Sequence, residues 1–301
     1  MSKVMSHRSL ERLGRGLTGS CVAISFALVV TLIVMVTYHG LTTFIVDGIS
    51  PVSFFCGDVW NPHETGDNGV PLLGALPMIV GSFAVTLLSC VFALPFAIGS
   101  AICIVEIIPR IGRTVIQPVI EVFVGIPSVV FGLIGLMIVV PWTAGWAGGT
   151  GYGIFSAAIV LAVMILPTIT SLSVDAIAAV PQSYRLGSYG LGCMRWQTIW
   201  HVVLRSALPG LLTATILGMA RAFGEALAVQ MVIGNATAIP DSLFTPASTL
   251  TSILTMGMGN EAMGTIPNDA LWSLALILMG MSLVFIAIVH LVGRKGANVH
   301  A

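Results

Sequence analysis

Long apolar runs separated by polar segments dominate this chain, a pattern that predicts membrane-spanning helices. Residues 17–36 carry no charge, and about 20 apolar residues are enough for a helix to cross a bilayer. The uncharged stretch between Asp67 and Glu106 is too long for one straight helix, so we expect an interfacial piece at 70–76 and a helix start at Pro77. Six spans are predicted, over residues 17–36, 79–104, 114–140, 154–174, 206–233 and 271–292.

Composition supports a membrane protein and excludes two other classes. Of the 301 residues, 56% are apolar and only 8% are charged. Soluble domains contain about 25% charged residues, so this chain has too little charge to cover a soluble enzyme. Its apolar content also excludes intrinsic disorder. The basic residues ahead of the first span are also typical of a secretory signal, but no small-residue cleavage site follows, so we expect the span to be retained.

The distribution of charge predicts the orientation in the membrane. If the N-terminus is inside, the inner segments are 1–16, 105–113, 175–205 and 293–301, and they hold eleven of the twelve Lys and Arg residues. The outer loops hold none of the basic residues and seven of the twelve acidic ones, and their Gly, Pro, Asn and Thr predict turns and short irregular segments. Because basic loops stay in the cytoplasm, we expect a multi-pass protein of a prokaryotic cell membrane with both termini cytoplasmic.

Motifs for enzymatic chemistry are missing from the sequence. A nucleotide-binding P-loop needs Gly-Lys-Ser/Thr, and neither Lys3 nor Lys295 has that context. His63-Glu64 lacks the second histidine of a zinc motif, and no nucleophile–base cluster is visible. We therefore predict no catalytic residue, no metal site and no cofactor in this chain. Five scattered cysteines, of which only Cys56 faces outward, predict no outer disulfide within the chain.

The longest inner segment, residues 175–205, predicts a compact helical knob. Pro181 is typical of a helix start, Ser183 through Leu191 offers a short helix, and Gly190 and Gly192 break it. A second helix is expected from Met194, with apolar side chains at helical spacing at Trp196, Ile199 and Trp200. The knob could lie on the lipid surface with its tryptophans as anchors, or it could bind a cytoplasmic partner.

In this place the sequence resembles ABC importer permeases, which carry a Glu-Ala-Ala-x3-Gly-x9-Ile-x-Leu-Pro loop. Aligned on Gly192, the chain has Leu186-Gly187-Ser188 at the first three positions, and Val202, Leu204 and Arg205 at the last three conserved ones. The glycine, the apolar position and the leucine are kept, whereas the leading glutamate and the final proline are not. The resemblance implies that the knob couples to an ATPase through Arg185, Leu186, Gly187, Ser188, Tyr189, Gly190, Gly192, Arg195 and Trp196.

Two further stretches are more specific. GIPSVVFGLIGL at 125–136 and LGMARAFGEALAVQMVIGN at 217–235 resemble the third and fifth spans of phosphate-specific permeases. The second resembles the PstC type and not its PstA partner, because Gly-Glu is followed by Ala-Leu-Ala-Val and the stretch ends in Ile-Gly-Asn. With the spans between them, the resemblance covers residues 70 to 294. It implies an all-α integral membrane fold with six transmembrane helices, in which a type I ABC importer permease (MetI-like) core follows an extra N-terminal span. The expected organisation is a cytoplasmic N-terminus (1–16), the first span with its outer loop (17–69), the core (70–293) and a cytoplasmic tail (294–301).

The same resemblance implies the partners. These are a second permease of the PstA type, two ATP-binding subunits of the PstB type that hold ATP and Mg, and an extracytoplasmic phosphate-binding protein of the PstS type. The lipid bilayer is a further partner, and no nucleic acid is expected. The function implied is ATP-driven phosphate import. A permease for sulfate or molybdate, a stand-alone secondary transporter and an intramembrane enzyme are the alternatives that the residues leave open.

Arg221 and Glu225 fall inside the fifth predicted span. A charge at mid-membrane costs about 2.5–3.5 kcal/mol, and a spacing of four predicts both side chains on one helix face. The pair could neutralise itself, or it could line the substrate pathway, where an arginine fork suits phosphate and a neighbouring carboxylate weakens the grip.

In the third span, Gly125, Pro127 and Ser128 predict either a simple kink or a pore-lining bend, and in the second case Ser128 joins the pathway. For Glu121 we expect a structural role. Gly132 and Gly135 are expected to allow close helix packing.

Overall fold

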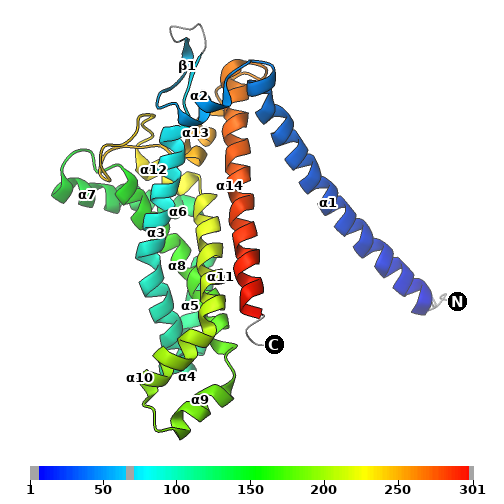
Figure 1. Cartoon of the computed structure of the whole chain (residues 1–301), viewed down its shortest axis with the longest axis vertical. Coiled ribbons are helices and arrows are strands. Elements are labelled where there is room, and N and C mark those ends of the chain that lie inside the picture. Colours follow the sequence, from blue (N-terminus) through cyan, green and yellow to red (C-terminus); the bar gives the residue numbers. More distant parts are fainter. Residues whose placement is uncertain (1–6, 66–70, 298–301) are drawn as a thin grey trace, which may run out of the picture.

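The computed structural model describes residues 7–65 and 71–297. The outermost parts of the predicted termini (1–6 and 298–301) and the segment 66–70 of the first outer loop lie outside the described residues. Most of the long helices run along one axis, and the start of α1 and the end of α14 both lie in the lower half of Figure 1. Within the described residues, six helices are long and apolar enough to cross a membrane, as the hydropathy pattern predicts.

Four of the spans agree with their predicted positions. The first lies in α1 (His7–Ile45), the second in α3 (Leu76–Ile102), the fourth in α8 (Ile154–Ala178) and the sixth in α14 (Ile266–Ala297). Pro77 stands in the first turn of α3, where its missing N–H leaves no bond unmade.

The predicted bounds of the third and fifth spans are wrong because each chain segment breaks where a continuous helix was expected. The third span runs from Ser128 to Ala147 instead of 114 to 140 and consists of α6 (Ser128–Ile134), η3 (Gly135–Val139) and α7 (Val140–Ala147). The preceding part of the predicted span is a separate helix, α5 (Gln117–Val124). The fifth runs from Arg195 to Phe223 instead of 206 to 233, and α11 (Leu204–Phe223) is followed by a separate short helix, α12 (Leu227–Ile233).

The inner end of the molecule is a series of short helices. After α3 come the π-helical turn η1 (Cys103–Ile107), α4 (Pro109–Ile111) and η2 (Gly112–Ile116), which lead into α5. The knob contains α9 (Gln182–Gly190) and α10 (Arg195–Thr198), and η4 (Ile199–Val203) joins it to α11. Figure 1 shows α9 and α10 below the bundle, where the chain returns to the membrane.

The outer loops are more ordered than the turns that their composition predicts. The first contains α2 (Pro51–Cys56) and an antiparallel pair of strands, β1 (Trp60–Thr65) and β2 (Pro71–Leu73), with Trp60 opposite Leu73. The last contains α13 (Leu250–Gly257). These pieces pack on one another because they bury apolar side chains in a shared cluster, which includes Phe54, Trp60, Leu73, Met78, Leu250 and Leu274. The expected piece at 70–76 is therefore mainly strand β2.

The core lies between α3, α8, α11 and α12. Close packing at the predicted glycines is confirmed: a Cβ on Gly132 would lie 2.7 Å from Met231 Sδ, and one on Gly135 would lie 2.4 Å from Val160 Cγ2. In contrast, α1 leans away from the bundle and meets α14 only near its outer end (Figure 1). Its side chains from residue 14 to residue 35 are exposed, so this apolar face is left to lipid or to another subunit.

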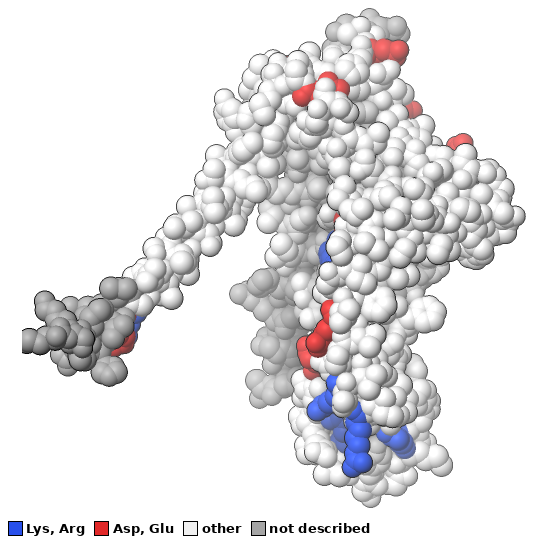
Figure 2. All heavy atoms as spheres, turned by 180° about the vertical axis from the view of Figure 1, so that it is seen from behind, with Lys and Arg blue, Asp and Glu red and all other residues white. Residues whose placement is uncertain are grey.

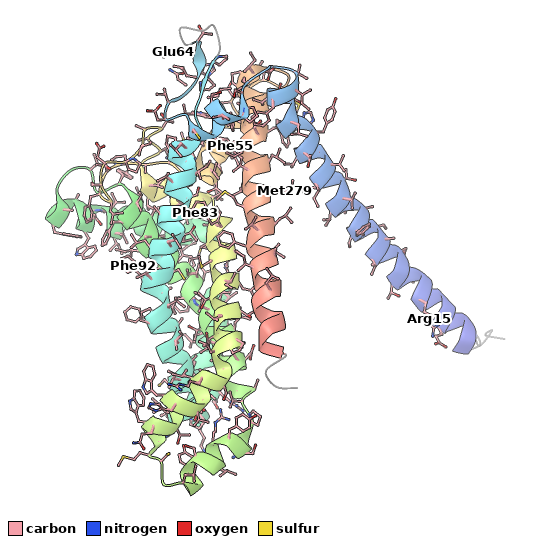
Figure 3. All side chains as sticks on the ribbon, in the orientation of Figure 1. Arg15, Phe55, Glu64, Phe83, Phe92 and Met279 are labelled. Atoms are coloured by element: carbon pink, nitrogen blue, oxygen red, sulfur yellow. The ribbon has the colours of Figure 1, made fainter. Side chains whose placement is uncertain are left out.

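The two ends of the molecule differ in charge. In Figure 2, basic side chains gather at the end formed by α9 and α10, an acidic patch lies directly above them, and further acidic side chains lie toward the opposite end. In Figure 3, Arg15 lies near the lower end of α1, and Glu64 of β1 lies at the other end of the molecule. The fold therefore concentrates basic side chains at the end of the molecule formed by α9 and α10.

Candidate functional site

A break in the chain separates Arg221 from Glu225. Helix α11 ends at Phe223, and Glu225 lies in the short connection to α12. Its carboxylate accepts a hydrogen bond from the backbone N–H of Ala228 at 3.2 Å, and its carbonyl oxygen accepts one from the Thr251 hydroxyl at 2.8 Å. The prediction that both charges share one helix face is therefore wrong, because the helix does not continue from one to the other.

Arg221 binds a neutral partner instead. Its Nη1 donates to the hydroxyl oxygen of Thr168 on α8 at 2.6 Å, and the arginine is half-buried. Among the residues that the structure describes, no ion pair involves Arg221. Because a hydroxyl supplies no negative charge, the guanidinium keeps its full positive charge and its other N–H donors. That is the state in which it could bind an anion.

A small cavity, lined by polar and apolar side chains in equal number, lies beside Glu225. The Ser82 and Thr86 hydroxyls of α3, together with Thr249 and Thr251, line it, and its volume is about 10 Å³. A site of this size holds about one water molecule and has no room for an oxyanion. The Ser82 hydroxyl accepts a hydrogen bond from the Leu250 N–H at 2.9 Å, so α3 and the start of α13 close the cavity.

The chain also breaks at the predicted bend in the third span. Gly125 ends α5, and Pro127 has an extended ψ of 137° at the residue before α6. Ser128 is the first residue of α6 and is half-buried. This geometry is a complete interruption of the helix, so it goes further than a kink. Nearby, Glu121 is exposed and accepts a hydrogen bond from Gln117 within α5.

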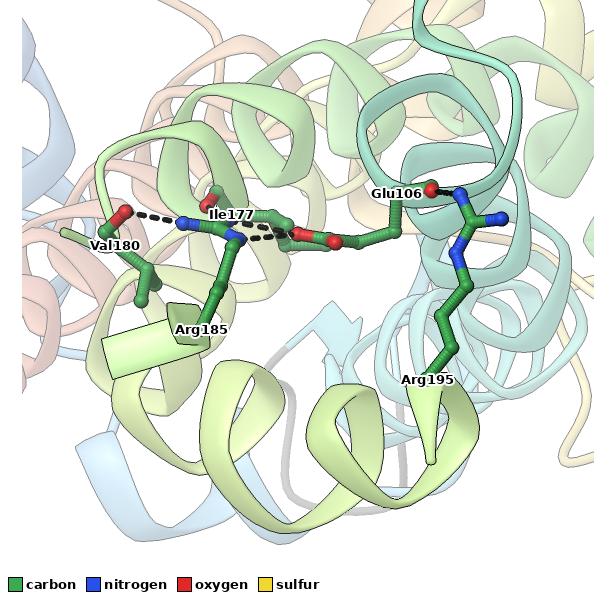
Figure 4. A network of polar contacts seen from close by, with 5 residues as sticks. All are labelled: Glu106, Ile177, Val180, Arg185 and Arg195. Atoms are coloured by element: carbon green, nitrogen blue, oxygen red, sulfur yellow. Dashed lines mark hydrogen bonds and ion pairs between the residues drawn. The ribbon is translucent and has the colours of Figure 1, made fainter. Parts of the chain in front are cut away.

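The knob is attached to the rest of the chain through Glu106 in η1 (Figure 4). Nε and Nη2 of Arg185 donate to its Oε1 at 2.9 and 2.7 Å, and the two side chains are 16% and 8% exposed. The same guanidinium donates to the carbonyl oxygens of Ile177, at 3.0 Å, and of Val180. Arg185, predicted as a coupling residue, therefore points into the protein and positions α9.

Arg195 makes the second attachment. It donates to the backbone carbonyl oxygen of Glu106 and, at 3.1 Å, to that of Ile107. Between the two knob helices, the hydroxyls of Ser188 and Thr198 lie 2.9 Å apart and are buried. Gly192 has a φ of +82°, which favours glycine at the turn between α9 and α10. These contacts make the knob one unit with the inner end of α3.

The remaining knob residues present an apolar surface. Leu191 is 86% exposed and Met194 is 74% exposed, and Gly187 and Gly190 are also on the outside. The other exposed large side chains here are Tyr184, Leu186, Tyr189, Trp196 and Trp200. We define the knob face as Tyr184, Leu186, Tyr189, Leu191, Met194 and Trp196. Such a patch is typical of a surface that a partner or a lipid covers.

Two residues of this site were not predicted from the sequence. Glu106 is the only acid in the inner segment 105–113, which also holds Arg110 and Arg113. A single acid in a basic segment could have indicated an ion pair. Thr168 has no signal of its own, because a threonine after a proline in an apolar helix is common. Only the packing of α8 on α11 places it next to Arg221.

Comparison with known proteins identifies the family. The model of the binding-protein-dependent transport system inner membrane component matches residues 93–296. The chain belongs to this family. It is 48% identical to the probable ABC transporter permease protein YqgH of Bacillus subtilis (strain 168), over 96% of this chain and 93% of the relative. It is 32% identical to the phosphate transport system permease protein PstC of Pasteurella multocida (strain Pm70), over 95% and 92%.

Solved structures agree with this family in fold. An inward-facing structure of the MetNI methionine ABC transporter aligns with a TM-score of 0.51 at 22% identity, over 73% of this chain and 94% of that one. The family members are membrane translocation subunits and not enzymes. This chain is therefore an ABC importer permease subunit and a multi-pass inner membrane protein, with a MetI-type core.

Proposed function

We propose that this subunit forms half of the translocation pathway of an ATP-driven phosphate importer. The observation that carries the proposal is the similarity, at about 30% identity over most of the chain, to permeases whose names state phosphate transport. The partners proposed with it are a PstA-type permease, two PstB-type ATPases and a PstS-type binding protein. Both termini would then be cytoplasmic, in agreement with the charge of the loops.

Arg221 supplies chemistry that fits this substrate. Phosphate carries negative charge and needs several hydrogen-bond donors, which a planar guanidinium provides in pairs. In the membrane-spanning part, Arg221 is held by the Thr168 hydroxyl and keeps donors for an anion. We propose that it contacts phosphate transiently during passage. Glu225 lies on the α12 side of the break and bonds the start of α12. It therefore acts on the pathway by positioning α12 and not by pairing with Arg221.

The knob face is the proposed docking surface for the ATPase. It is apolar and exposed, and the Glu106 contacts connect it to α3, so a movement of the partner would reach the membrane helices. ATP binding would close the partner subunits and shift the population of the membrane helices between outward- and inward-facing arrangements.

Uptake of radiolabelled phosphate by phosphate-starved cells tests the proposal. The gene is deleted and restored in a strain without other phosphate importers, and ATP depletion and collapse of the proton gradient are separate treatments. Restored uptake that fails on ATP depletion but survives loss of the gradient is the expected result. Uptake that depends on the gradient alone would instead make the chain a secondary transporter, and unchanged phosphate uptake would point to another substrate.

Competition identifies the oxyanion. An excess of unlabelled phosphate should abolish the uptake of label, whereas equal concentrations of sulfate and molybdate should leave it unchanged. If sulfate or molybdate displaces the label as well as phosphate does, the proposed specificity is wrong even though the chain remains an importer permease.

A further inference from the structure

A cavity of about 190 Å³ lies at the outer end of the molecule, where β1, the end of α13 and the start of α14 meet (Figure 1). Its buried walls are apolar and include Trp60 and Leu271. Met256 and Asn260 also line the cavity and are exposed, so it opens to the outside. Small-molecule sites typically measure about 300–1,000 Å³, so this smaller cavity suits a single side chain.

Among the described residues, Glu261 is the only charged side chain that lines this cavity. Its backbone N–H donates to the Gly257 carbonyl oxygen at 3.1 Å, and its own carbonyl oxygen accepts a hydrogen bond from the Asn268 side chain at 3.3 Å. These bonds join it to the end of α13 and the first turn of α14, so the carboxylate has a fixed position. The side chain is only 21% exposed, and a carboxylate with so little access to water is stabilised by a matching positive charge.

The chain itself supplies no strong cation for this carboxylate. No Lys or Arg occurs between residues 16 and 109 or between 222 and 293, and these two stretches contain every residue that lines the cavity. The ionic contact that the structure shows is the Nε2 of His63 on β1, 3.1 Å from Glu261 Oε1. Because His63 is 67% exposed, water competes for it and the pair contributes little. Glu261 is therefore open to a stronger partner from another molecule.

We propose that this cavity receives one Lys or Arg side chain of the extracytoplasmic binding protein. The apolar stem of that side chain would pack on Trp60 and Leu271, and its charged head would pair with Glu261 in place of His63. The family of this chain is named for its dependence on a binding protein, and the cavity opens at the outer end. The inference rests on the proposed function for the identity of this partner.

Charge over the wider outer surface agrees with a basic partner. Asp58, Glu64 and Asp241 are exposed there, and no Lys or Arg lies in the same stretches of chain. Exposed charges of one sign attract an oppositely charged protein and mainly raise its association rate. A partly buried charge pair instead slows dissociation, because separating it leaves a carboxylate with little water around it. Glu261 and the exposed acids should therefore affect different rate constants.

Binding kinetics test the proposal, with the complete transporter in lipid nanodiscs and the purified, phosphate-loaded binding protein of the same cell as the probe. In Glu261→Gln the dissociation rate should rise at least about tenfold, whereas the association rate should change little. Asp241→Asn is the matched control, because it removes an exposed acid from the loop between α12 and α13. It should slow association slightly and leave the dissociation rate unchanged.

Two further variants separate the cavity from the carboxylate and from the contact with His63. Met256→Trp fills the cavity at its exposed side and keeps Glu261, so the dissociation rate should again rise on the order of tenfold. His63→Gln removes only the competing partner, and dissociation should be unchanged or slower. If His63→Gln dissociates as fast as Glu261→Gln, the pair acts by holding the β1 hairpin in place, and the proposal is wrong.

Failure of the docking site and failure of the proposed function give different results. A binding protein that neither binds the wild-type transporter nor stimulates its ATPase excludes the phosphate importer and this partner together. Normal binding to the wild type, with unchanged dissociation in Glu261→Gln or Met256→Trp, overturns the docking site alone. Equal changes in Asp241→Asn and Glu261→Gln overturn it as well, in favour of attraction by the whole acidic surface.

Discussion

The carboxylate of Glu106 receives the side chain of Arg185 and its backbone carbonyl receives Arg195, so one residue fixes both helices of the knob. Glu106→Gln would leave the Arg185 guanidinium, which is 16% exposed, without a counter-charge. Removing one partner of a buried pair costs about 3–5 kcal/mol, and we expect a lower melting temperature and reduced ATP-driven uptake. The matched control is Glu11→Gln, which breaks the exposed Arg15–Glu11 pair at 2.8 Å and should change neither.

The guanidinium of Arg221 is the group proposed to contact phosphate. Arg221→Lys keeps the charge but loses the planar fork, so the variant should reach normal amounts in the membrane and take up phosphate at least about tenfold more slowly. The readout is initial uptake rate divided by permease amount from an immunoblot. Thr168→Val is the companion variant, since it removes the hydroxyl that holds Arg221 and leaves the fork intact. Full uptake in Arg221→Lys would exclude a role for the fork.

At the scale of elements, glycines set how closely helices approach the outer loops. A Cβ on Gly81 would lie 2.1 Å from the carbonyl oxygen of Ser248, whereas a Cβ on Gly99, in the same helix α3, would meet nothing within 4 Å. Because a backbone oxygen cannot rotate away, Gly81→Ala should destabilise the fold by about 1–3 kcal/mol. Gly99→Ala should be neutral or stabilising, since alanine is the better helix former. Thermal unfolding of the two variants, measured side by side, checks the difference.

The sequence predicted elements where long-range hydropathy decides, and it failed where local backbone geometry decides. All six spans were predicted, because each needs about 20 apolar residues in a row. At Gly125–Pro127 a bend was predicted, because glycine and proline signal it locally, but not a full interruption of the helix. The break after Phe223 was not predicted at all, because no proline marks it. The Arg221–Glu225 pairing failed for the same reason: the spacing of four has meaning only inside a continuous helix.

At the scale of the whole molecule, contacts between distant segments were the least predictable. The composition of the outer loops indicated turns, yet Trp60 and Leu73 pair across a hairpin and join a core with Leu250 and Leu274. Glu106 and Arg185 are 79 residues apart in the chain, and nothing in either local sequence indicates the other. The knob itself was predicted correctly as two short helices around a glycine turn, because its signals are local.

The prediction at this scale is the orientation of the chain in the membrane, because the basic residues of several loops fix the direction of all the spans together. Cys56 is exposed in the outer region and Leu191 is 86% exposed on the knob, at opposite ends of the molecule. Two variants are made: one keeps Cys56 as its only cysteine, and the other has no native cysteine but carries Leu191→Cys. A membrane-impermeant maleimide should label the Cys56 chain in intact spheroplasts. It should label the Leu191→Cys chain only after the membrane is opened. The partner ATPase is left out of the strain, because it would cover the knob face. Labelling of the knob from outside would reverse the topology, and the positive charges at α9 and α10 would then need another explanation.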